Sequence, residues 1–143
     1  MTTENPNFNK PIFANRFLRA LSRIRRNRPN NNSNPSSLRR RSKKIKMAAY
    51  ASMASAAAGS NKAWTRALIR RLRNRRRPRS GLHHRVVVRE TEPVGRVDEL
   101  RRLVPGGRGM DFDTLLDETA HYVQCLSSQV ALMQSIADSI IMD

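Results

Sequence analysis

Histidine and cysteine are the side chains most often used as metal ligands or nucleophiles, and this chain has three histidines and one cysteine. His121 lies four residues before Cys125 and four after Asp117, so a helix would place the three on one face. A zinc site needs a further ligand of this kind, and His83 and His84 are far away in the sequence. We therefore expect His121 and Cys125 to be ordinary residues on the flank of a helix, with no metal and no cofactor.

Catalysis requires a nucleophile, a base and a group that stabilises developing charge, and no set of residues here suggests that assembly. The glycine-rich run at 106–109 follows a predicted helix rather than a strand, so it is a connector and not a phosphate-binding loop. The single cysteine allows no intramolecular disulfide, which indicates a reducing compartment. No apolar run approaches the roughly 20 residues that a membrane-spanning helix needs. We predict that the chain is not an enzyme, has no small-molecule substrate and does not bind a membrane.

Charge is distributed unevenly along the 143 residues. The net charge is +17, but residues 1–93 carry +21 and residues 94–143 carry −4. A basic arm joined to a mildly acidic, apolar-patterned segment indicates two separate roles. The arm should bind nucleic acid weakly and without sequence preference, with a Kd on the order of 10⁻⁴ to 10⁻⁶ M.

Two basic clusters in this arm resemble nuclear-localisation signals. The candidate residues are Arg39, Arg40, Arg41, Lys43, Lys44, Lys46, Arg75, Arg76 and Arg77. An acid-poor, arginine-rich N-terminus also matches an organellar transit peptide, but the basic character continues far beyond a typical presequence. We therefore predict a nuclear protein.

Short helices with long connections are expected in the arm. An apolar stripe that includes Phe13 and Phe17 predicts a basic amphipathic helix from about Lys10 to Arg28, followed by a disordered linker at 30–37. The alanine-rich stretch at 47–58 favours helix but lacks bulky anchors, so we expect little tertiary order there. Ser60 or Asn61 could cap a further helix around Trp64.

The C-terminal segment has the strongest pattern. A helix over 97–104 is ended by Pro105-Gly106-Gly107, and a long helix follows Asp111 and Asp113, with apolar residues repeating every 3.5 positions. Two helices in about 50 residues cannot enclose a core, so we predict dimerisation. The expected dimer contacts are Val97, Leu100, Leu103, Val104, Leu115, Leu116, Val123, Leu126, Val130, Met133 and Ile136.

An alternative is that this stripe packs within the chain, against the helices that carry Phe13 and Phe17 or Trp64 and Leu68. The predicted domain organisation has three parts. Residues 1–37 form a basic helix and linker, residues 38–93 form an arginine- and alanine-rich arm, and residues 94–143 form a helix-loop-helix dimerisation domain.

The stretch VDELRRLVPGG at 97–107, followed by MDFDTLLDETAHYVQCLSSQVALM at 110–133, resembles the helix-loop-helix half of plant basic helix-loop-helix (bHLH) proteins. With KAWTRAL at 62–68, the chain is similar to the small atypical bHLH proteins that restrain growth in brassinosteroid and gibberellin signalling. The resemblance implies half of a parallel four-helix bundle formed with a bHLH partner. The fold class is then all-α, a helix-loop-helix module with a largely disordered, partly helical basic N-terminal arm.

The resemblance also identifies the positions that would read DNA. Counted back from Pro105 by the family's spacing, the histidine, glutamate and arginine positions fall at Leu82, Val86 and Glu90. Valine offers no hydrogen bond to a base, and a glutamate facing phosphate has the wrong charge. Pro93 would interrupt the helix that carries a basic region into the groove. Sequence-specific DNA recognition by this chain is therefore not expected.

The resemblance implies a transcriptional repressor that forms heterodimers with bHLH factors, blocks their DNA binding and restrains cell elongation. A homodimer is also possible on the same pattern. The alternative is a basic nuclear protein that binds nucleic acid directly and self-associates through its C-terminal helices.

Overall fold

The computed structural model describes residues 5–27, 34–75 and 95–142. All regular structure in these ranges is helical, so the predicted all-α class is confirmed. None of the described helices is long and apolar enough to cross a membrane. The elements are α1 (Lys10–Arg26), α2 (Pro35–Ala56), the 3-10 turn η1 (Ala58–Ser60), α3 (Ala63–Asn74), α4 (Arg96–Leu103), the 3-10 turn η2 (Gly107–Gly109) and α5 (Phe112–Met142).

Helix α1 begins and packs as its sequence pattern predicts. The Asn9 side chain accepts a hydrogen bond of 3.0 Å from the backbone N–H of Ile12, and Pro11 lies in the first turn. Phe13 and Phe17 are buried, with their ring centroids 5.4 Å apart. The apolar side of α1 therefore faces the core, and its arginine-rich sides face solvent.

Helix α2 corrects two predictions. It begins at Pro35, capped by the Asn34 side chain, so the linker expected at 30–37 is shorter at its C-terminal end. The prediction of little tertiary order in the alanine-rich stretch is wrong, because Ala49, Met53 and Ala54 lie in the core. Small side chains at a helix contact reduce the distance between helix axes, and here they allow α2 to pack against α1 and α3.

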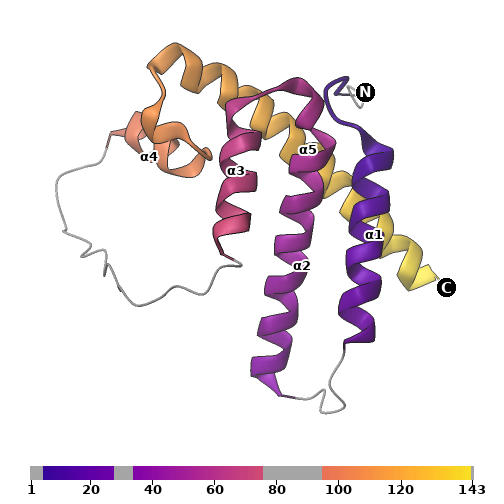
Figure 1. Cartoon of the computed structure of the whole chain (residues 1–143). Coiled ribbons are helices and arrows are strands. Elements are labelled where there is room, and N and C mark those ends of the chain that lie inside the picture. Colours follow the sequence, from indigo (N-terminus) through magenta and orange to yellow (C-terminus); the bar gives the residue numbers. More distant parts are fainter. Residues whose placement is uncertain (1–4, 28–33, 76–94, 143) are drawn as a thin grey trace.

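Helices α1, α2 and α3 lie side by side with alternating direction, and α5 crosses behind all three (Figure 1). Core side chains meet between this three-helix layer and α5, with Trp64, Met53 and Leu115 fully buried. The prediction of a largely disordered basic arm is therefore wrong over residues 5–27 and 34–75, which fold into this three-helix layer. The sequence left open whether the C-terminal apolar residues pack within the chain, and one face of α5 does pack against these three helices.

The connector between α4 and α5 depends on two glycines. Gly106 has a φ of 78°, and a Cβ there would lie 3.0 Å from the Cβ of Ala67 on α3. A Cβ on Gly107 would lie 2.7 Å from the carbonyl oxygen of Arg101. The Arg101 guanidinium also donates to the carbonyl of Met110. The Gly106 approach places the loop beside α3, and the contacts of Gly107 and Arg101 hold the loop against α4.

Candidate functional site

Helix α5 has two apolar faces. One face packs on the three-helix layer and includes Leu115, His121 and Cys125, all buried. At 100° per residue, the other face lies on nearly the opposite side of the helix from His121 and Cys125, and it remains in solvent. Its side chains are 46% to 81% exposed, and we call them the α5 stripe: Phe112, Leu116, Val123, Val130 and Ile141.

The structure divides the predicted dimer contacts between these two faces. Val104 and Leu115 are buried against the chain's own helices, so they are not part of an outer surface in this arrangement. Leu100, Leu126, Met133 and Ile136 are half-buried beside that core, and the remaining predicted contacts are exposed. The exposed ones are Val97, Leu103, Leu116, Val123 and Val130.

Glu118 joins α5 to the start of α3. Its carboxylate accepts hydrogen bonds from the backbone N–H groups of Ala63, at 3.0 Å, and Trp64, at 2.9 Å. Its side chain is buried, and the negative charge lies at the positive end of the α3 dipole. The cap predicted from Ser60 or Asn61 is therefore wrong, because a residue 55 positions away supplies it. No local sequence signal identifies such a partner.

Trp64 and His121 form the second bond of this contact. The indole Nε1–H donates to Nδ1 of His121 at 2.9 Å, so the neutral ring carries its proton on Nε2. Burial lowers the pKa of His121, and Lys62 lowers it further, while Glu118 and Asp117 raise it. We call the bonds of Glu118 and His121 to α3 the α3–α5 latch.

An ion pair lies at the exposed edge of this latch. Lys62 Nζ is 2.5 Å from a carboxylate oxygen of Asp117, and the hydrogen bond and charge of Lys62 lower the pKa of Asp117. Since the Asp117 side chain is largely exposed, this pair adds little to stability compared with the buried bonds of Glu118.

His121 and Cys125 are core residues rather than the flank residues that the sequence suggested. Burial raises the pKa of the Cys125 thiol to about 11, and Asn5 donates to its sulfur at 3.6 Å. A thiol of this pKa is a poor nucleophile and a poor metal ligand at neutral pH. Among the described residues, no group of three or more His, Cys, Asp and Glu side chains is arranged to hold a metal ion.

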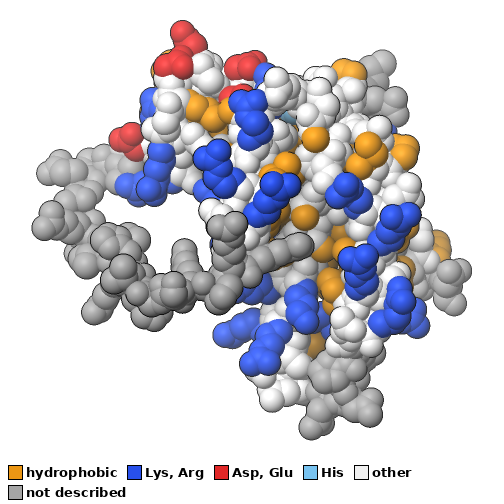
Figure 2. All heavy atoms as spheres, viewed as in Figure 1, with side chains coloured by type: hydrophobic (Ala, Val, Ile, Leu, Met, Phe, Trp, Pro, Cys, Tyr) orange, Lys and Arg blue, Asp and Glu red, His pale blue; other side chains and the backbone are white. Residues whose placement is uncertain are grey.

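The predicted localisation residues lie on the basic layer. The cluster 39–46 occupies the first half of α2 and is largely exposed, and Arg75 directly follows α3. Figure 2 shows Lys and Arg side chains spread over α1, α2 and α3 on the face turned away from α5. The other candidates lie outside the described residues, as do the degenerate DNA-reading positions: Arg76, Arg77, Leu82, Val86 and Glu90.

Comparison with known proteins relates the chain to plant transcription factors. Residues 7–76 match the family model for the IBH1-like N-terminal domain. The chain is 37% identical to Transcription factor IBH1 of Oryza sativa subsp. indica, over 90% of this chain and 78% of that protein, and equally to its counterpart in subsp. japonica. It is 30% identical to Transcription factor IBH1-like 1 of Arabidopsis thaliana, over 72% of this chain and 80% of that protein. No solved structure matches the chain.

Proposed function

The chain belongs to the IBH1-like family, and on that basis we propose that it regulates transcription in the nucleus. Its relatives in rice and Arabidopsis are named transcription factors, which supports this role. We propose further that it acts as a repressor, by binding the helix-loop-helix of a bHLH activator. In line with the resemblance of residues 97–133, growth and brassinosteroid responses are the processes that it would restrain.

The α5 stripe is the observation that carries the proposal. Leu116, Val123 and Val130 are seven residues apart, the repeat that lets one helix pack along another. Single exposed apolar residues are common on protein surfaces, but a row of them on one helix face marks an interaction site. Because the opposite face of α5 already packs in the core, a partner can occupy the stripe without disturbing the fold.

Repression follows from what such a heterodimer would lack. A bHLH dimer reads two half-sites, one with each basic region. This chain would bring no competent basic region, because the reading positions hold Leu82, Val86 and Glu90. Each base pair that the heterodimer does not read costs it about 1–3 kcal/mol of discrimination. We therefore expect the heterodimer to bind the activator's DNA site much more weakly than the activator dimer does.

Co-precipitation with purified plant bHLH domains tests the proposal. Val123→Glu and Val130→Glu place charge on exposed positions of the stripe, so they should abolish partner recovery without unfolding the chain. Gln124→Glu is the matched control, since it adds the same charge at an exposed position of α5 beside the stripe. Undiminished recovery of every partner by both stripe variants would exclude α5 as the dimer surface.

Direct nucleic-acid binding with self-association is the second candidate, and the basic layer favours it. Sedimentation of the full chain distinguishes the two functions. The bHLH proposal predicts that the chain alone is largely monomeric at micromolar concentration and shifts to a larger species when a bHLH domain is added. A stable homodimer that ignores added bHLH domains would favour the second candidate.

A further inference from the structure

A row of arginines follows one side of α1. Arg16, Arg19, Arg23 and Arg26 are spaced by 3, 4 and 3 residues, which returns each to the same side of a helix. All four are exposed. From the first to the last they advance by about 15 Å at 1.5 Å per residue. We call these four residues the α1 arginine row.

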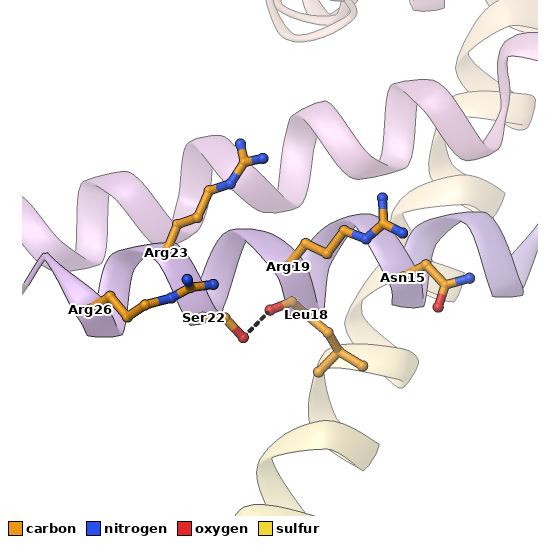
Figure 3. Close-up of a pocket in the computed structure, with 6 residues that line it drawn as sticks. All are labelled: Asn15, Leu18, Arg19, Ser22, Arg23 and Arg26. Atoms are coloured by element: carbon orange, nitrogen blue, oxygen red, sulfur yellow. Dashed lines mark hydrogen bonds between the residues drawn. The ribbon is translucent and has the colours of Figure 1, made fainter.

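Three members of the row line a shallow surface groove together with Asn15 and Ser22. Figure 3 shows the side chains of Arg19, Arg23 and Arg26 extending from α1 and leaning toward its N-terminal end. The Ser22 hydroxyl donates to the carbonyl of Leu18 at 3.0 Å, so its proton is already used within the helix. The donors that the groove presents to a ligand are therefore mainly guanidinium N–H groups, which bind phosphate oxygens in pairs.

No carboxylate of the three-helix layer balances this charge. Residues 5–27 and 34–75 contain 18 Lys and Arg and no Asp or Glu. The acidic residues that the structure describes all lie between Asp98 and Asp138. One of them, Asp117, forms an ion pair with Lys62, which lies at the start of α3 and not on α1. The α1 arginine row therefore faces solvent without a counter-charge from the described part of the chain.

We propose that the α1 arginine row binds the phosphodiester backbone of double-stranded DNA without reading its sequence. A row of exposed cations along one side of a helix can follow a regular line of phosphates, and neutralising those phosphates releases bound counterions. The site lies on α1 and is distinct from the α5 stripe, so the inference does not rest on the proposed bHLH partner.

Burial of the aromatic residues favours duplex DNA over single strands. Single-stranded nucleic acids bind proteins largely through bases stacked on exposed aromatic rings. On the described helices of the basic layer, Phe13, Phe17 and Trp64 are buried, as is Phe8 just before α1. The Tyr50 ring is half-buried and has the Lys46 ammonium 5.9 Å from its centroid. Such a surface offers contacts to a backbone and no platform for bases.

Fluorescence anisotropy of the full chain with a labelled 24-base-pair duplex of random sequence tests the proposal. Arg19→Gln/Arg23→Gln/Arg26→Gln should weaken binding at least tenfold at 0.1 M salt. It should also reduce the slope of log K against log salt by roughly 2 to 3, since each phosphate contact contributes about 0.9. Arg19→Lys/Arg23→Lys/Arg26→Lys keeps the charge and removes the paired donors, so its slope should change little while its affinity falls less than that of the glutamine variant.

A second triple variant separates a local site from net charge. Arg96→Gln/Arg102→Gln/Arg108→Gln removes the same charge from exposed positions of α4 and η2, and it should weaken binding less than threefold. Equal losses from the two glutamine variants would overturn the proposal, as would displacement of the duplex by oligo-dT or polyglutamate at lower concentration than by unlabelled duplex.

Discussion

Replacing Glu118 by alanine should destabilise the fold more than any other substitution of a single acidic residue. In the native state its carboxylate accepts the backbone N–H groups of Ala63 and Trp64, at 3.0 and 2.9 Å. Removing the acceptor leaves the buried Trp64 N–H unpaired, at a cost of about 1–3 kcal/mol. The half-buried Ala63 N–H and the missing dipole interaction add about 1 kcal/mol more. We expect a total loss of about 2–4 kcal/mol.

Urea unfolding of the full chain measures this loss, with Trp64 as the probe. Trp64 is the single tryptophan and is fully buried, so its fluorescence reports the α3–α5 contact directly. Circular dichroism at 222 nm on the same samples tests whether the helices unfold in the same transition.

Asp117→Ala is the matched control for Glu118→Ala. It removes the neighbouring carboxylate and its ion pair with Lys62, but the Asp117 side chain is largely exposed, so the cost should stay below about 1 kcal/mol. Glu118→Gln should lie between the two, because its amide oxygen accepts one N–H while its NH₂ group faces the positive end of α3. A loss of less than about 0.5 kcal/mol for Glu118→Ala would refute the assignment of this residue as the cap of α3.

Three further predictions concern the core and the connector. Burial lowers the pKa of His121, so the contribution of this residue to stability is complete above pH 6.5 and is lost as the pH falls through the lower pKa of the folded state. The urea concentration at the unfolding midpoint should therefore fall between pH 7.5 and pH 5. An equally steep fall in the His121→Gln variant would contradict this prediction. The Cys125 thiol, with its pKa raised to about 11, should react with a thiol-specific reagent at pH 8 far more slowly in the native chain than in urea; equal rates would mean that the sulfur is accessible. Gly107→Ala should lower the free energy of unfolding by about 1–3 kcal/mol, because the new Cβ would lie 2.7 Å from the Arg101 carbonyl oxygen. Gly109→Ala is the control, since a Cβ there would have no atom within 4 Å, and thermal unfolding should show almost no change in its stability.

Local signals predict the helices of this chain better than its packing. The asparagine cap and proline of α1 and the Pro-Gly-Gly stop of α4 are short-range features, and the structure has those boundaries close to the predicted positions. The alanine-rich part of α2 differs from its prediction because its anchor is close helix approach, a tertiary property that composition alone does not show. The α3 cap differs for a similar reason, since Glu118 reaches it from 55 residues away.

Periodicity alone could not divide α5 into its two faces. Apolar residues occupy most of its circumference, and a repeat of 3.5 fits both the face that includes Leu115 and the face that includes Leu116. The buried polar side chains Glu118 and His121 interrupt the apolar pattern on the inner face, so the pattern favours the other one. The Glu118 carboxylate and Nδ1 of His121 accept hydrogen bonds from α3, while Nε2 of His121 has no hydrogen-bond partner among the described residues. The sequence of α5 alone does not contain these α3 partners.

The proposed function gives the two faces of α5 different roles, and their chemistry explains why both can be retained. The inner face combines apolar packing with hydrogen bonds from Glu118 and His121 to α3, so it fits one set of neighbours in one register. The α5 stripe is apolar without such bonds, so it can pack against any helix with a matching seam. A substitution on the inner face should therefore reduce the stability of the chain itself. A substitution on the stripe should change which proteins the chain binds while leaving its fold intact.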